Sequence, residues 1–301
     1  MIFQDVQRNK RRTMGIVFGF ILFIALVTYF SSIVAFGPNP IFPIIALAFA
    51  SISAFIAYYN SDKIILKLSN AREATREEHR QLKTIMEGLC IATGLPMPRL
   101  YIIEDPALNA FATGRNPENA VIAITTGLLE KLDKYELEAV MAHELAHVKN
   151  YDILLQTIVT VMVGFVVIIS DFAIRMAFFN NNRSSDSGKA GLIILAIGLV
   201  FMILAPIFTA LIRFALSRKR EYLADATAVE ITRKPDGLIR ALQKLTADQT
   251  ELKSACKSTA NLYIVSPFKK KEAQEKKQQK TSLFATHPSI EDRVKALQNL
   301  Q

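Results

Sequence analysis

Cysteine and histidine are both scarce in this chain. Only two cysteines, Cys90 and Cys256, occur among 301 residues. These are too few for a zinc site made of thiolates or for a disulfide framework. Only four histidines occur, and two of them lie in the single run His143–His147. That run therefore holds half of the histidines that a metal site in this chain could use.

Recognition motifs for nucleic acid are absent as well. The chain carries a net charge of +9, which by itself would suit an anionic partner. Lys and Arg residues beside long hydrophobic runs account for much of this charge, through membrane topology and anionic lipid. We therefore expect no nucleic-acid partner.

Charged residues are missing from four long hydrophobic runs. Hydrophobic residues make up 51% of the chain and the mean hydropathy is +0.25, both high for a soluble protein. The runs are Gly15–Phe36, Ile41–Tyr59, Ile153–Ser170 and Ala190–Ile212. Each has about 18 to 23 residues, near the roughly 20 that cross a bilayer. We predict four transmembrane helices, as hairpins within residues 1–60 and 153–216. For the second pair a re-entrant hairpin is the alternative, and the third run also fits a buried core helix.

The basic residues around the first hairpin indicate its orientation. The first run is too long for a signal peptide and lacks a small-residue cleavage site, so we expect it to stay attached as an anchor. The link Gly37–Pro40 has no charge, whereas both outer flanks carry Lys and Arg. The positive-inside rule then places residues 61–152 and 217–301 in the cytoplasm, and the link Phe178–Lys189 outside. We predict a multi-pass protein of the cytoplasmic (inner) membrane.

Between the hairpins the pattern predicts a small sheet beside a helix. Apolar residues at spacings of three and four indicate a helix over Ala71–Thr93. The β-branched segments Arg99–Glu104 and Ala120–Thr125 read as strands, with Asn109–Gly114 as an edge strand. Asp133–Asn150 follows as a helix with Asp133 as its N-cap. The predicted fold class is α+β, mainly α, with a zincin-like domain integrated with four transmembrane helices.

The carboxyl-terminal part is expected to contain a mobile loop and a last helix. Phe268–Lys280 has almost no apolar content, which suits a solvated linker or, alternatively, adhesion to lipid headgroups. From Pro288 on, apolar residues return at helical spacing and predict a packed terminal helix.

The run His143-Glu144-Leu145-Ala146-His147 has the HExxH spacing. Histidines four apart lie one above the other on a helix and can share one zinc ion. In this motif the Glu acts as general base and is not a ligand. The run therefore predicts His143 and His147 as zinc ligands and Glu144 as the catalytic base.

A third ligand is needed, and the next segment offers no histidine for it. Asn150 and Tyr151 stand where the longer HExxHxxGxxH pattern needs other residues, so we look for a carboxylate. Glu221 and Asp225 follow the fourth run. With helices of 1.5 Å rise, the motif histidines lie about 9 to 15 Å before the third run and Glu221 about 13 Å after the fourth. If both helices are continuous, Glu221 reaches the height of the histidines; a bend at residues 150–152 would weaken this argument.

Three protein ligands leave a fourth zinc position for water, whose pKa falls to about 7. Glu144 would take the proton of that water and return it to the leaving amine. Asp225 is placed to hydrogen-bond the second nitrogen of a ligand histidine, the alternative being a helix-surface residue.

Two further assignments carry strong alternatives. Asn109, on the edge strand, would bind the backbone of an extended peptide, or else form a turn. His287 would stabilise the oxyanion of the tetrahedral intermediate, or else act as a structural histidine before Pro288.

The chain resembles the HtpX family of membrane-integrated zinc metalloproteases, with more distant similarity to the CAAX prenyl proteases. The resemblance covers nearly the full length and shows no departure in the motifs. These are Asn109–Gly114, His143–His147, Ser217–Asp225, Thr286–Ser289 and the two hydrophobic pairs. It implies one zinc ion held by His143, His147 and Glu221, Glu144 as base, and a role in degrading damaged or misassembled membrane proteins.

Three other functions fit less well. An intramembrane protease would carry HExxH inside a spanning segment, but Glu136, Glu138 and Lys149 surround this motif. A transporter would need ionisable groups deep in the membrane, where only Asp171 and Arg175 qualify. A scaffold with structural zinc would have no use for Glu144. We therefore predict a membrane-bound zinc endopeptidase acting in protein quality control, with protein substrates taken from the membrane.

Overall fold

The structure is a computed structural model. It describes residues 7, 9, 11, 13–22, 25, 26, 29, 41–162, 164, 218–255, 259–265, 267 and 288–299. The predicted links Phe178–Lys189 and Phe268–Lys280, the residue His287, the last part of the third hydrophobic run and the whole of the fourth lie outside the described residues. The described part is mostly helical, with one small sheet, as the sequence predicts.

The sheet has four strands in the order β1-β2-β4-β3. Their bounds are β1 Ala71–Glu73, β2 Arg99–Ile103, β3 Ala110–Thr113 and β4 Val121–Thr125. β2 and β4 run parallel, while β1 pairs with β2 and β3 pairs with β4 in antiparallel fashion. β3 therefore lies at one edge, where the sequence predicts an edge strand.

The helix before the sheet is shorter than predicted. The prediction started it at Ala71, but Ala71–Glu73 form β1, and helix α3 spans Arg76–Thr93. Thr75 and Glu78 form a capping box that starts the helix at Arg76, because each side chain bonds the other's backbone N–H. Gly94, with φ of 69°, ends α3 as predicted.

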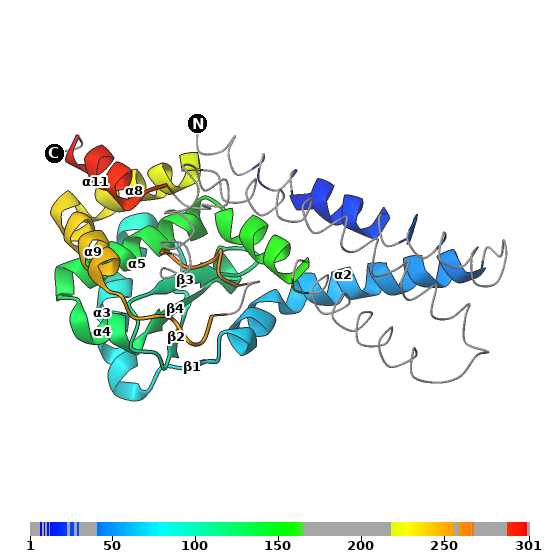
Figure 1. Cartoon of the computed structure of the whole chain (residues 1–301), viewed down its shortest axis with the longest axis horizontal. Helices are drawn as coiled ribbons and strands as arrows, with labels where there is room; N and C mark the ends of the chain where they lie inside the picture. The colour runs from blue at the N-terminus through cyan, green and yellow to red at the C-terminus, as the bar shows by residue number, and fades with distance from the viewer. Residues whose placement is uncertain are drawn as a thin grey trace.

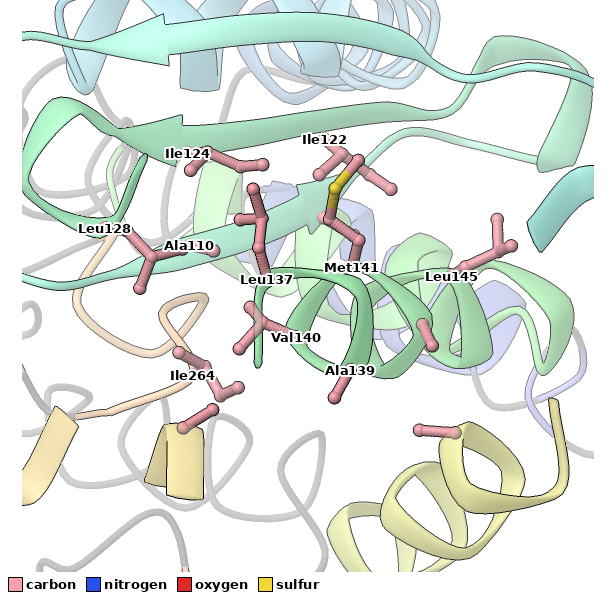
Figure 2. Packing of buried hydrophobic residues seen from close by; sticks show 14 of the residues in the cluster. Ala110, Ile122, Ile124, Leu128, Leu137, Ala139, Val140, Met141, Leu145 and Ile264 are labelled. Atoms are coloured by element: carbon pink, nitrogen blue, oxygen red, sulfur yellow. The ribbon is translucent and has the colours of Figure 1, made fainter. Parts of the chain in front are cut away.

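The central helix α5 packs on one face of the sheet. It spans Lys134–Lys149, and its N-cap Asp133 accepts hydrogen bonds from two backbone N–H groups, as predicted. Leu137 and Met141 point from α5 towards Ile122 and Ile124 of β4 (Figure 2). The same core includes the apolar face of α3, so α5 is enclosed on several sides.

The chain bends directly after α5. Tyr151 has φ of 58°, a left-handed conformation that is uncommon for a residue other than glycine. Residues 152–162 then form a new helix. The assumption of one continuous helix through this point was therefore wrong.

The remaining helices cover α5 or join the strands. Their bounds are the 3₁₀ helix η1 Pro117–Asn119, α4 Thr126–Lys131, α8 Arg218–Thr232, α9 Pro235–Ala247 and α11 Ile290–Gln298. α8 and α9 pack on α5, and α11 packs on α8 and α9. The predicted carboxyl-terminal helix is thus confirmed, and Leu297 anchors it in the core.

A long helix extends from this body. α2 spans Ile41–Leu68 and is drawn in light blue beside the dark blue amino-terminal helix (Figure 1). Met162 and its neighbours in the helix of residues 152–162 pack against Phe20 and Tyr58, so the three helices form one bundle. Many large apolar side chains of α2 are exposed, among them Ile44, Ile52 and Phe55. Within the described part of the chain, none of the helices combines the length and apolar character that crossing a membrane requires.

Candidate metal centre

Two helices bring three ligand-type side chains together. His143 and His147 lie one turn apart on α5, and Glu221 comes from α8. The Nε2 atom of His143 lies 3.9 Å from Glu221 Oε2, and that of His147 lies 3.7 Å from Glu221 Oε1. One ligand atom from each residue falls within 4.8 Å of the others, and all three side chains are buried. The structure thus places together the three residues that the sequence singles out as ligands.

A carboxylate touches the second nitrogen of His143. Asp225 Oδ1 lies 2.9 Å from His143 Nδ1, which is the contact that the sequence predicts for Asp225. This contact favours the tautomer with hydrogen on Nδ1, so that the lone pair of Nε2 faces Glu221. Asp225 is one helical turn after Glu221 on α8, so the same helix supplies both carboxylates.

Asp225 is itself held by an arginine that the sequence analysis missed. Arg293 on α11 donates from Nη2 to Asp225 Oδ1 at 2.6 Å and from Nε to Oδ2 at 2.8 Å. Its Nη1 also lies 3.6 Å from Glu221 Oε2. Burial alone would raise the pKa of Asp225, but the Arg293 guanidinium outweighs this effect and holds that pKa below its usual value. The two carboxylates of α8 therefore share one buried counter-charge.

A signal for Arg293 was present in the sequence. Ile290, Val294 and Leu297 form the apolar stripe of the last helix, and Arg293 lies within that stripe at helical spacing. A charged residue on the buried face of a helix needs a partner of opposite charge. The stripe alone could not say which carboxylate that partner would be.

A second carboxylate touches His147. Asp152, the first residue after the bend, places Oδ2 3.2 Å from His147 Nδ1. Burial lowers the pKa of His147, but the bond to Asp152 and the charges of Glu221 and Glu144 outweigh it and raise that pKa to about 9. These acidic neighbours therefore favour the protonated form of the imidazole. Sequence spacing did not reveal Asp152, because only the bend at Tyr151 turns it back towards α5.

The donor set fits a zinc ion. Two imidazoles and one carboxylate are ligands that zinc takes in catalytic sites with three protein ligands. His143 Nε2 is buried, and among the described residues it has no hydrogen-bond partner. A buried ring nitrogen without a donor is costly, and a cation bound to its lone pair would remove that cost.

Glu144 is also buried near these side chains, and the sequence predicts for it the role of a base, not of a ligand. Burial, together with the nearby Glu221 carboxylate, raises its pKa to about 7, against the opposing effects of His147, Arg293 and the Ala112 N–H. The Ala112 N–H, which lowers this pKa, belongs to the edge strand β3. A group that titrates near neutral pH can both accept and return a proton.

Asn109 directly precedes the edge strand β3, and it is buried. Its side chain is only 2% exposed. Its Nδ2 donates to the carbonyl of Val265 at 2.9 Å, and the Ile264 N–H donates to the Ala110 carbonyl of β3 at 3.0 Å. The amide thus ties residues 261–265 to the edge strand and is not turned towards a peptide. For His287 the sequence predicts either stabilisation of the oxyanion or a structural role. This residue lies outside the described residues.

Comparisons with known proteins agree with this site. The signature of Peptidase family M48 matches residues 76–301. A protein named Protease HtpX homolog from Listeria monocytogenes serotype 4a (strain HCC23) is 41% identical, over 100% of both chains. Another of that name, from Dictyoglomus thermophilum, is 43% identical over 98% of this chain and 93% of its own. The resemblance to the HtpX family is thereby confirmed.

A solved structure shows the same fold. Ste24p from S. mikatae aligns with a TM-score of 0.52 and 20% identity. The alignment covers 98% of this chain but 66% of the Ste24p chain. At that identity the likeness concerns the fold alone.

Proposed function

Since the chain belongs to Peptidase family M48 and is a metalloprotease, we propose that it is a zinc-dependent endopeptidase anchored in a membrane. The observation that carries this proposal is the buried cluster of His143, His147 and Glu221 with Glu144 beside it. His143, His147 and Glu221 would hold one zinc ion, and the bound ion would supply a Lewis acid that activates water.

The side chains around the cluster have distinct tasks in this mechanism. Glu144 takes a proton from the attacking water on its carboxylate and hands it to the nitrogen of the leaving amine. The Ala112 N–H favours the ionised form of that carboxylate. Asp225 and Asp152 orient His143 and His147 through their Nδ1 atoms. Arg293 balances the charge of Asp225 and Glu221.

Substrate hydrolysis near a membrane surface is the second part of the proposal. The four charge-free runs of the sequence support membrane anchoring. The exposed apolar side chains of α2 support it as well, because such a surface is unfavourable in water. The distribution of Lys and Arg supports a cytoplasmic active site. We further propose that damaged or misfolded membrane proteins are the substrates, as the family resemblance implies.

The catalytic part is tested by Glu144→Gln. This change keeps the shape of the side chain but removes the proton acceptor, so cleavage of an unfolded protein should fall by about 10²-fold or more. Zinc content by elemental analysis should stay at that of the parent chain. Glu138→Gln, the same change on the same helix, should leave cleavage intact. Unchanged proteolysis by Glu144→Gln would refute the mechanism.

The orientation is tested with a reporter fused after Asn60. Because both flanks of the first hairpin are rich in basic residues, the reporter should be active in the cytoplasm. Activity of the reporter on the outer side of the membrane would overturn the proposed orientation.

A further inference from the structure

Asp152 makes a second set of contacts that the proposed mechanism does not use. Its Oδ2 lies beside His147, while its Oδ1 accepts a hydrogen bond from Asn9 Nδ2 at 2.9 Å. Arg220 Nε lies 3.5 Å from the same Oδ1. Asp152 is 1% exposed, so these protein groups surround its carboxylate. Because Asp152 contacts the His147 ring, the groups that fix the Asp152 carboxylate also help to fix the orientation of that ring.

Asn9 comes from the amino-terminal segment, ahead of the first hydrophobic run. Its amide nitrogen has two hydrogens, and it also donates to the carbonyl of Asn150 at 3.1 Å. One side chain thus binds both ends of the bend that contains the left-handed Tyr151. Asn9 is 3% exposed, and its backbone carbonyl accepts a hydrogen bond from the hydroxyl group of Thr13. The contact is therefore part of a buried network and not a surface encounter.

We propose that Asn9 is a positioning residue for the metal site, acting through Asp152 on His147. The inference rests on the proposed zinc site and deepens it, because it makes the amino-terminal helix a structural support of the ligands as well as an anchor. It joins residues more than 140 positions apart in sequence.

The chemistry of an amide suits this task. A neutral donor fixes the direction of the Asp152 carboxylate but leaves its negative charge in place. That charge can then stabilise the Nδ1–H of His147 and increase the basicity of Nε2 towards a metal ion. The other ligand histidine is supported differently, since Arg293 binds Asp225 with two hydrogen bonds. At Asp152 the short hydrogen bond comes from the amide of Asn9, and the guanidinium of Arg220 lies farther away, at 3.5 Å.

The experiment measures zinc affinity of the full chain in detergent, by competition with a chromophoric chelator. Asn9→Ala should weaken zinc binding by about three- to tenfold, less than the 10- to 100-fold typical when an outer carboxylate itself is lost. Asn9→Asp, of nearly the same size, should weaken it at least as much, because it sets a second carboxylate against Asp152. Gln7→Ala is the matched control, since Gln7 is an exposed residue of the same segment.

Two further readouts separate positioning from general destabilisation. In the Asp152→Ala background, Asn9→Ala should add no further loss of affinity, because the route to His147 is already broken. The visible absorption bands of the cobalt-substituted chain should shift in Asn9→Ala and not in Gln7→Ala, because they report ligand geometry.

The outcomes divide clearly. Parent-like affinity and cobalt bands in both Asn9 variants would overturn the inference while leaving the zinc site intact. An undiminished effect of Asn9→Ala in the Asp152→Ala background would overturn it too, since the effect would not pass through Asp152. A parent chain that binds no zinc would refute the proposed function and the inference together.

Discussion

The helices α5 and α2 depart from ordinary burial in opposite ways. α5 buries nearly every side chain from Glu136 to Val148, including the charged or polar groups His143, Glu144 and His147. α2 exposes large apolar side chains along most of its length, such as Ile44 and Phe55 at 65% and 64%. Polar groups are normally outside and large apolar clusters inside. Each helix therefore requires a partner from outside the described chain: a cation for the buried polar groups of α5, and an apolar environment for the exposed side chains of α2.

The difference shows what each helix requires. Burying imidazole and carboxylate groups is costly unless hydrogen bonds or a metal ion compensate for lost water. On α5, Asp225, Asp152 and Arg293 supply part of that compensation, and the proposed zinc ion would supply the rest. On α2, exposed apolar surface would be favourable against lipid. The comparison thus separates the helix that carries the two histidines of the candidate metal centre from the helix that exposes apolar side chains.

The largest expected effect is the loss of the metal ion that the histidines of α5 would bind. Glu221→Ala deletes the carboxylate that faces both Nε2 atoms, so the metal content should fall from about one ion per chain to near zero. Elemental analysis of purified protein measures this. Glu230→Ala, an exposed position on the same helix, should keep its metal. Full zinc occupancy in Glu221→Ala would contradict the ligand assignment.

The next effect contrasts the same substitution on the two helices. Leu137→Ala opens a cavity between α5 and the sheet and should lower the free energy of unfolding by about 2 to 5 kcal/mol. Leu47→Ala on α2, where the side chain is exposed, should change it by less than about 0.5 kcal/mol. Denaturant unfolding in detergent, followed by circular dichroism, measures both. Equal losses would mean that α2 is packed as tightly as α5.

The last test concerns the location of α2. Ile52→Lys places a charge on its exposed apolar surface and should cost about 3 kcal/mol if that surface meets lipid. The fraction of protein recovered in membranes should therefore fall. Ile91→Lys is the control, because Ile91 is 84% exposed on α3, which packs with the sheet and α5. Similar membrane recovery for both variants would argue against a lipid-facing α2.

Local patterns predicted the central elements well. The spacing of His143 and His147 required only a helix, and the N-cap Asp133 and the apolar residues of α5 specify that helix within a short window. The strands β2 and β4 also follow from their own β-branched residues. Such features depend on neighbours a few residues away, so a single sequence contains most of the information.

Errors arose where a local pattern competed with a partner in space. Ala71–Glu73 extend the helical pattern, but backbone pairing with β2 makes them a strand. Asn109 has the composition of a turn or a binding residue, but Val265, distant in sequence, occupies its amide. Neither partner could be recognised from spacing along the chain.

The sequence by itself determined the HExxH helix, the choice of a carboxylate after the fourth run, the edge strand and the last helix. Each depends on residue type and short periodicity. Only the tertiary structure decided how the ligands are supported. The left-handed Tyr151 turns Asp152 onto His147, α11 brings Arg293 to Asp225, and the amino-terminal segment brings Asn9 to Asp152. The contacts of Arg293 and Asn9 join residues distant in sequence and form only when helices pack, and the contact of Asp152 depends on the backbone conformation of Tyr151. No spacing in the sequence marks any of them.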